Sequence, residues 1–421
     1  MPKALQGVLY TLSRRRMAQH LSRRYGNVYT VSLPVFGPAV FVNHPDLVKQ
    51  VFLASPEELG NIQPNLSRLL GSCSVFALEG AEHRRRRNLL SPSFHGKSVR
   101  AYEHIVIEET LRETAGWPAG KTFETLRPMN RITLNVILRA IFGAEGAELD
   151  TLRRIVPPWV TLGSRLAALP MPSRTYGRFS PWGRLAEWRR QYEAVVDGLI
   201  RDVRADPNFE DRTDVLSVLL RSSYEDGTAM SRGEIGDELL TFLAAGHETT
   251  ASTLAWAFER LTRHPELLAD LVAEADGDEN TLRRAFVREV QRTRTVIDFA
   301  GRHVYAPTFQ LGEWVIPRGY SIIVGISRVH ASVDAFEDPD RFDPGRYLTG
   351  NPSAFEWIPY GGGTRRCPGS AFANLEMDIV LRTVLRHFTI EPNMAPGEKW
   401  HARGVAFTPK DGGRIVVHPR G

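Results

Sequence analysis

The sequence predicts a mostly α-helical protein with a small β-rich part. Apolar residues recur with helical periodicity from about residue 82 to 290 and again at about 368–388. Alternating apolar residues and turn signals indicate strands at about 28–43 and 303–326, with further strand-like pieces near the C-terminus. Because no repeat or low-complexity linker separates these parts, we expect one domain over residues 1–421.

Length and composition favour a globular protein of a reducing compartment. The 421 residues are 42% hydrophobic and can bury a sizeable core. The two cysteines, Cys73 and Cys367, cannot build a disulfide framework. No stretch approaches the roughly 20 apolar residues needed to span a bilayer, and residues 1–10 lack the layout of a signal peptide. We therefore expect a cytoplasmic protein without a transmembrane segment.

Arginine is unevenly distributed in a chain of net charge +5. Arg14, Arg15, Arg16, Arg23 and Arg24 crowd the first predicted helix, and residues 84–87 are four consecutive arginines. Such runs can bind nucleic acid, but no aromatic stacking pattern accompanies them, so nucleic acid is not expected as a partner. The first cluster indicates either a solvated helix face or a face resting on a membrane surface, and both readings remain open.

In chain order, two short strands flank a turn at 36–38 and a helix follows near 45–53. The longest predicted helix starts with a capping box at Ser231 and Glu234 and can continue to His264, where Pro265 ends it. Within it lie Ala-Gly-His-Glu-Thr-Thr, residues 245–250. The small residues leave space beside the helix, and an acid and an alcohol follow them. The alternative is a buried helix with small residues at a crossing.

The segment from Tyr360 to Gly369, Tyr-Gly-Gly-Gly-Thr-Arg-Arg-Cys-Pro-Gly, is the most informative of the sequence. Its glycines allow close approach of the backbone to a flat ligand, and Pro368 suits the first position of a helix. A sulfur at a helix N-terminus favours the thiolate form, which can serve as an axial ligand of haem iron. The alternative is an ordinary loop with an inert thiol.

This segment resembles the haem-binding loop of the cytochromes P-450, Phe-x-x-Gly-x-Arg-x-Cys-x-Gly. Gly363, Arg365, Cys367 and Gly369 match, whereas Tyr360 replaces the phenylalanine and adds a hydroxyl near the sulfur. Residues 245–250 match the family's Ala-Gly-x-(Asp/Glu)-Thr-(Thr/Ser) at every position. The resemblance covers nearly the whole chain. It implies the soluble, bacterial-type cytochrome P-450 fold, a triangular helical prism around a buried haem b (iron protoporphyrin IX) with a small β-rich lobe.

The resemblance also implies roles for individual residues. Cys367 would be the axial ligand of the haem iron, Thr249 would hydrogen-bond the distal oxygen, and Glu248 would feed protons through water. His247 receives no ligand role. The other residues implied to contact haem, four of them through its propionates, are Ala245, Gly246, Tyr360, Gly361, Gly369, Arg365, His83, Arg87 and Arg302. Arg84, Arg85 and Arg86 are expected to face solvent and, with Arg366, to form a basic docking surface for an acidic ferredoxin.

A structural network is implied as well. Glu289 and Arg292 lie three residues apart on one helix face and resemble the family's Glu-x-x-Arg. Arg346 of Asp-Pro-Gly-Arg would be the third partner. The proline that the family carries soon after the second residue is absent, and Thr295 lies near its place. The network is expected to stabilise the fold around haem and to take no part in catalysis.

The implied activity is insertion of one oxygen atom from O2 into a lipophilic small molecule. The chain carries no flavin or iron–sulfur motif, so electrons would come from a separate ferredoxin and an NAD(P)H-dependent ferredoxin reductase. Phe76, Phe242, Phe299 and Val304 are candidate residues of the substrate pocket. Two alternatives are peroxide-driven or rearrangement chemistry, against which the Glu248–Thr249 pair argues, and a ligand sensor without turnover, which would not consume NAD(P)H.

Overall fold

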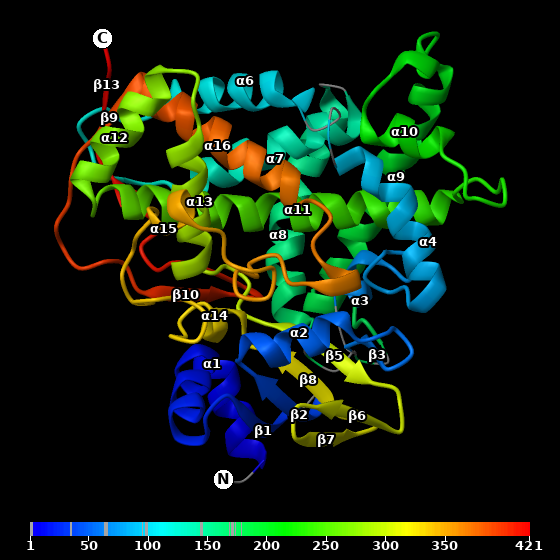
Figure 1. Cartoon of the computed structure of the whole chain (residues 1–421). Helices are drawn as coiled ribbons and strands as arrows, with labels where there is room; N and C mark the ends of the chain where they lie inside the picture. Colours follow the sequence, from blue (N-terminus) through cyan, green and yellow to red (C-terminus); the bar gives the residue numbers. More distant parts are fainter. Residues whose placement is uncertain are drawn as a thin grey trace.

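One long helix, α11 (Arg232–Leu261), crosses the helical body and organises it (Figure 1). Its capping box forms as predicted, with Ser231 and Glu234 each bonded to the other's backbone N–H. The helix ends three residues earlier than expected, because turns over 262–264 lead into α12. The computed structural model describes residues 3–33, 36–62, 66–94, 96, 100–143, 146–167, 169, 172, 174–177 and 179–421, and the side chains among them apart from those of 3–12 and 93.

The remaining helices surround α11 or cover the β-rich part (Figure 1). They are α1 (Lys3–Tyr25), α2 (Pro45–Leu53), α3 (Ser67–Leu70), α4 (Gly80–Leu90), α6 (Glu103–Thr114), α7 (Leu126–Phe142), α8 (Ala147–Leu166), α9 (Pro181–Ala205), α10 (Val215–Arg221), α12 (Pro265–Asp276), α13 (Thr281–Thr293), α14 (Ile326–Val329), α15 (Arg346–Thr349) and α16 (Ser370–His387). Of the helices that the structure describes, none has the length and apolar character to cross a membrane.

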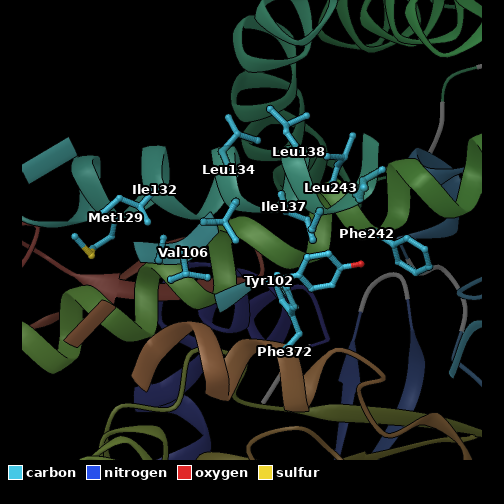
Figure 2. Close-up of a cluster of buried hydrophobic side chains, with 14 of the residues drawn as sticks. Tyr102, Val106, Met129, Ile132, Leu134, Ile137, Leu138, Phe242, Leu243 and Phe372 are labelled. Carbon is cyan, nitrogen blue, oxygen red and sulfur yellow. The ribbon is translucent and has the colours of Figure 1, made fainter. Parts of the chain in front are cut away.

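The main core lies where α7 packs against α11, and side chains near the start of α6 and on α16 close it (Figure 2). Met129, Ile132 and Leu138 of α7 are fully buried, as is Leu243 of α11. Burying such side chains contributes roughly 1.5–3 kcal/mol each. The middle of α11 is therefore fixed in position by its neighbours.

A five-stranded sheet of order β1-β2-β8-β5-β3 forms most of the β-rich part. Its strands are β1 (Val28–Leu33), β2 (Gly37–Val42), β3 (Leu59–Asn61), β5 (Ala300–Val304) and β8 (Ser321–Val324). Neighbouring strands are antiparallel except β2 and β8, which pair in parallel with Ala39 opposite Ser321. Apolar side chains of this sheet and of α2 make a second, smaller core.

Four two-stranded sheets complete the structure, β10 with β11, β12 with β4, β13 with β9 and β6 with β7. Their strands are β4 (Phe123–Glu124), β6 (Thr308–Leu311), β7 (Trp314–Pro317), β9 (Phe388–Ile390), β10 (Trp400–Arg403), β11 (Ala406–Pro409), β12 (Arg414–Ile415) and β13 (Val417–Pro419). The mostly helical class with a small β-rich lobe is confirmed. One boundary is wrong, because the helix expected from Pro368 begins at Ser370, after a turn at Pro368 and Gly369.

Candidate functional site

A backbone hydrogen bond closes the loop that carries Cys367. The Cys367 N–H donates to the Tyr360 carbonyl at 3.0 Å, which closes the loop. Cys367 has exposed surface, yet burial among protein atoms is the main cause that raises the pKa of its thiol. The Gly369 N–H and the charges of Arg87 and Arg366 lower the pKa of the thiol, which is the direction expected for the local field, and burial opposes them.

Two glycines of the loop allow close packing of the loop against α2. A Cβ on Gly362 would lie 2.1 Å from the Phe52 ring, and one on Gly363 would lie 2.1 Å from the Phe52 carbonyl oxygen. These two glycines let α2 pack against the loop. Gly361, with φ of +66° and open space around it, is the one glycine of the three that leaves room for a flat ligand.

Tyr360 connects the loop to two helices. Its hydroxyl lies 2.6 Å from Asn374 Oδ1 of α16 and accepts a hydrogen bond from Gln291 Nε2 of α13 at 2.7 Å. Burial is the main cause that raises the pKa of this phenol, and proximity to Cys367 adds to it. The extra hydroxyl is thus near Cys367, and its hydrogen bonds connect the loop to α13 and α16.

A strip of α11 is accessible in the middle of an otherwise buried helix. Ala245 is exposed, and Gly246 and Thr249 are half-buried, while most of their neighbours on the helix are buried. The Thr249 hydroxyl donates to the Ala245 carbonyl at 2.8 Å. A Cβ on Gly246 would lie 3.3 Å from Ile137, so this glycine also lets α7 approach. Ala245, Gly246 and Thr249 therefore form an accessible strip on an otherwise buried helix.

His247 and Glu248 point elsewhere. His247 Nδ1 lies 2.6 Å from the Leu243 carbonyl oxygen, and burial lowers its pKa to about 4, so the ring is neutral and faces the neighbouring helices. Glu248 Oε1 lies 2.9 Å from Nε of Arg403, at the end of β10. Burial raises the pKa of Glu248, against the opposing charges of Arg403 and Arg165. Arg403 was not predicted, because no motif marks it and only the fold brings β10 to α11.

The basic residues predicted to bind propionates come together. Glu79, His83, Arg87 and Arg365 line a pocket of about 260 Å³. Burial and the charges of the three arginines lower the pKa of His83 to about 3, and burial lowers the pKa of Arg302 to about 10. Arg365 pairs with Glu79 at 3.1 Å. The cluster has more cations than this one carboxylate balances, which fits a ligand that carries two carboxylates, as haem does.

Arg86 corrects the expectation that residues 84–86 face solvent. Arg84 and Arg85 are exposed, and Arg85 pairs with Asp226 at 2.5 Å. Arg86 is instead buried at 3% exposure and donates to Glu238 at 2.7 Å and to the Cys73 carbonyl at 2.7 Å. Three residues after buried His83, it lies on the same inward face of α4.

The Cys73 segment is held from both sides. Its N–H donates to Asp237 Oδ2 of α11 at 2.9 Å, and Asp237 also pairs with Arg189 of α9. A Cβ on Gly71 would lie 2.0 Å from the Asp237 carboxylate, so glycine is required there. Two carboxylates of α11 and the arginines of α4 and α9 therefore fix this segment.

The predicted structural network is present. Arg292 donates to both carboxylate oxygens of Glu289, at 2.7 and 2.6 Å, and Arg346 Nε lies 3.5 Å from Glu289 Oε1. Arg292 also donates to the carbonyls of His330, Pro339 and Arg341. The Thr295 hydroxyl, near the place of the family's proline, lies 3.0 Å from His330 Nδ1, and His330 Nε2 accepts from the Ile358 N–H. These contacts connect α13 to the chain that precedes the cysteine loop.

The candidate pocket residues do not gather in one place. Phe242 of α11 packs edge-on against Phe94 at 4.7 Å between ring centroids, and Phe76 packs against the main core. Phe299 lies near the sheet, with the Arg14 guanidinium 5.6 Å from its ring centroid. Val304 is fully buried in the smaller core between the sheet and α2, because the alternation of β5 directs it there. Val304 is therefore a core residue, and its prediction as a pocket residue is wrong.

The first arginine cluster is divided between the interior and the surface. Arg16, Arg23 and Arg24 are exposed, as predicted for either a solvated or a membrane-facing helix. Arg14 and Arg15 are half-buried and stack on aromatic rings of the β10–β11 hairpin, Arg15 at 3.6 Å from the Trp400 centroid and Arg14 at 4.3 Å from that of Phe407. These two arginines attach α1 to the hairpin.

Comparisons with known proteins agree with this geometry. The family model for cytochrome P450 matches residues 5–413. The chain is 66% identical over 419 residues to cytochrome P450 138 of Mycobacterium tuberculosis, covering all of this chain and 95% of that protein. It is 38% identical to cytochrome P450 135B1 of the same species, covering 98% of this chain and 89% of that protein.

Solved structures show the same fold. Retinoic acid-bound cyanobacterial CYP120A1 superposes with a TM-score of 0.85 at 23% identity, over 98% of this chain and 96% of the other. A cytochrome P450, CYP102L1, gives a TM-score of 0.81 at 22% identity, over 98% and 99%. At these identities the likeness concerns the fold alone, whereas the family rests on the model match and the mycobacterial relatives. The chain therefore belongs to the cytochrome P450 family of haem-thiolate oxidoreductases.

Proposed function

We propose that this protein is a monooxygenase that inserts one oxygen atom from O2 into a lipophilic small molecule. The observation that carries the proposal is the combination of the accessible Cys367 in its glycine-rich loop, the surplus of positive charge around His83, and the accessible strip of α11 at Thr249. Haem b, bound by these residues, would supply the activation of dioxygen.

Each set of residues has a separate task in this proposal. Cys367 holds the haem iron, and Tyr360 and Gly369 shape the loop around the sulfur. Ala245, Gly246 and Gly361 leave room for the flat ring. Arg365, Arg87 and Arg302 would neutralise the propionates, and His83, which lies among them, would donate a hydrogen bond to them.

Thr249 and Glu248 form the proton-handling pair. The Thr249 hydroxyl donates to the Ala245 carbonyl. By rotating its side chain it can instead donate to a molecule bound at the accessible strip of α11. Glu248 can exchange protons with water, since the Arg403 side chain that contacts it is about 31% exposed. Together they would deliver protons from water to the side of α11 where dioxygen is reduced.

A lipophilic substrate is supported by Phe242, an aromatic side chain on α11 one turn before the accessible strip. The relative CYP120A1 binds retinoic acid, itself an apolar molecule with one carboxylate. We infer the same broad substrate class here.

Electrons would come from a ferredoxin and its NAD(P)H-dependent reductase in the cytoplasm. Arg84 and Arg366 are exposed, and Arg366 borders a pocket of about 470 Å³ formed with Leu53, Phe355 and Trp357 next to the cysteine loop. An exposed arginine at the edge of an apolar hollow suits an acidic protein partner. The docking of that partner beside Cys367 would keep the electron path short.

The visible spectrum of the purified protein, reduced with dithionite under carbon monoxide, tests the proposal. The red-shifted Soret band of thiolate-bound haem is expected for the natural protein and for Cys73→Ala, the matched control. Cys367→Ala should lose that band. A thiolate spectrum that survives Cys367→Ala, or a histidine-type spectrum in the natural protein, would contradict the assignment of the axial ligand.

Turnover distinguishes an enzyme from a ligand sensor. Lipophilic compounds that shift the haem spin state are then supplied with O2, a ferredoxin system and NADPH. Oxygenated product that contains one atom from labelled O2 is expected. A protein that consumes no NADPH with any bound compound would be a sensor, and one that acts only with peroxide would belong to the rearrangement or peroxide class.

A further inference from the structure

An acid stands at the start of the helix that carries the basic cluster around His83. Glu79 immediately precedes α4, a place where a carboxylate usually accepts a hydrogen bond from the first turn of the helix. The Glu79 side chain makes no such bond. It lines the pocket of about 260 Å³ together with His83 and Arg87, and it is the one acid among the described residues of that lining.

The β-rich part holds this carboxylate in place. The Asn61 N–H of β3 donates to both of its oxygens, at 3.3 and 3.2 Å, and the hydroxyl of Tyr305, the residue after β5, donates to Oε1 at 3.1 Å. The Tyr305 ring lies against Gly60, where a Cβ would be 1.9 Å from the ring. The position of Glu79 is therefore set by two strands outside the helix that it precedes.

A further contact connects Glu79 to the cysteine loop. Arg365 Nη2 lies 3.1 Å from Glu79 Oε2 and donates to the carbonyl of the neighbouring Leu78 at 2.5 Å. The charge of Glu79 also reaches Arg302. Burial and the charge of Arg365 lower the pKa of the Arg302 guanidinium, and Glu79 acts in the opposite direction. One carboxylate thus acts on two arginines of the cluster.

The permanent charges of the cluster can be balanced against those of its proposed ligand. Arg87, Arg302 and Arg365 contribute three positive charges. Glu79 contributes one negative charge, and two ionised propionates would bring the negative charges to the same number. Removal of the Glu79 charge would leave one positive charge in excess beside an iron that accepts an electron.

We propose that Glu79 is a positioning residue of the haem site, which orients Arg365 and completes the charge of the propionate cluster, so that its carboxylate lowers the reduction potential of the haem iron. A negative charge near the haem opposes the addition of an electron. In this step the iron gains one electron, and no bond forms or breaks. The inference rests on the proposed haem site, and it does not depend on which molecule is oxygenated.

Spectroelectrochemical titration of the haem-loaded protein tests this inference without turnover. Glu79→Gln keeps the length of the side chain and removes its charge. We expect it to raise the electron affinity of the iron about three- to tenfold, or by about 30–59 mV for a one-electron couple. Glu79→Asp keeps the charge but withdraws it from Arg365, so the potential should rise by less. Glu82→Gln, the matched control, removes an exposed acid of the same helix and should leave the potential unchanged.

A double variant tests whether Glu79 acts through Arg365. In an Arg365→Gln background, the shift caused by Glu79→Gln should differ from the shift in the natural background, because coupled residues are not additive. Equal shifts in the two backgrounds would show that Glu79 acts by its charge alone and would contradict the positioning role.

An unchanged or lowered potential in Glu79→Gln would overturn the inference, and so would an equal rise in Glu82→Gln, because net charge alone would then explain the effect. If Glu79→Gln does not fold, Glu79→Asp carries the test, and a potential equal to that of the natural protein counts against the inference. The carbon monoxide spectrum of the natural protein reports separately on the haem-thiolate assignment, so failure of the proposed function is distinguishable from failure of this inference.

Discussion

The hydroxyl of Tyr360 and the side-chain carbonyl of Asn374 are 2.6 Å apart, which fastens the start of the cysteine loop to the helix that follows it. Gln291 of α13 donates to the same hydroxyl at 2.7 Å and to Asn374 at 3.1 Å. The three side chains form a closed polar group that connects α13, the loop and α16. A phenylalanine, the residue of the family pattern, would keep the ring and lose both contacts of the hydroxyl.

Tyr360→Phe is therefore expected to lower the free energy of unfolding by about 1 kcal/mol, the usual net value of a hydrogen bond with half-buried partners. Gln291 keeps its contact with Asn374, which limits the loss. Urea unfolding of the two proteins measures it. The absorption band of the carbon monoxide complex should keep its wavelength, because the hydroxyl bonds to Gln291 and Asn374 of the helices. A large shift of that band would show that the Tyr360 hydroxyl influences the iron–sulfur bond.

Arg86→Met should destabilise the protein by about 3–5 kcal/mol. Burial already raises the pKa of Glu238 to about 7, so without Arg86 this buried carboxyl would take up a proton, and the Cys73 carbonyl would lose its donor. Arg84→Met is the matched control from the same helix, and as an exposed change it should stay within about 0.5 kcal/mol. Unfolding midpoints in urea compare the two variants. Equal decreases in the free energy of unfolding of the two variants would show that the buried contacts of Arg86 do not stabilise the protein.

Stability should fall in acid partly because of His330. Its ring is buried, and burial lowers its pKa to about 3 from an ordinary 6.5. A depressed histidine contributes stability that is present above pH 6.5 and lost as the pH falls toward 3, because the unfolded chain takes up the proton first. Between pH 7 and pH 5 this amounts to about 2 kcal/mol.

His330→Gln should remove this one contribution. The difference in unfolding free energy between pH 7 and pH 5 is then expected to be about 2 kcal/mol smaller than in the natural protein, whatever the cost of the substitution at pH 7. His83 and His247 shift in the same direction and remain in both proteins, so some acid sensitivity persists. Identical pH dependence of the two proteins would contradict a neutral buried His330.

Thr249→Ala should leave haem binding intact and divert electrons to hydrogen peroxide. The hydroxyl contacts only a carbonyl of its own helix among the bonds described for it, so the fold does not depend on it. Peroxide and product formed per NADPH, measured with a compound that shifts the spin state, give the distribution of electrons. Thr249→Ser, which keeps a hydroxyl, should restore most of the product. If Thr249→Ala still forms as much product per NADPH as the natural protein, the hydroxyl of Thr249 is not required for proton delivery.

Local patterns predicted the helices and strands that carry the site. The capping box at Ser231, the arrangement of Glu289 and Arg292, and the gathering of basic residues around His83 all appear in the structure. Each depends on spacing along one element or on residues whose partners the family pattern already indicates. Such features are readable because the chemistry is contained in neighbouring sequence positions.

The residues that sequence reasoning missed have partners that only the fold supplies. Arg86 sits in a run of four arginines that looks uniformly solvated, and Glu238, 152 positions away, is what draws it inward. Arg403 lies in a short strand that matches no motif, and it contacts Glu248 only because the fold brings these two distant parts of the chain together. The family resemblance indicates Val304 as a pocket residue, whereas the alternation of its strand directs it into the smaller core.

The clamp on Cys73 has a mechanical consequence. Asp237 links this segment to Arg189 of α9, and Arg86 links it to α4 and to the beginning of α11. Separating α9 from α11 would break the Arg189–Asp237 pair, and separating α4 from α11 would leave buried Arg86 and Glu238 without each other. Because Asp237 and Arg86 also hold the backbone of Cys73, this segment moves with α4 and α11 as one body for as long as both pairs stay closed.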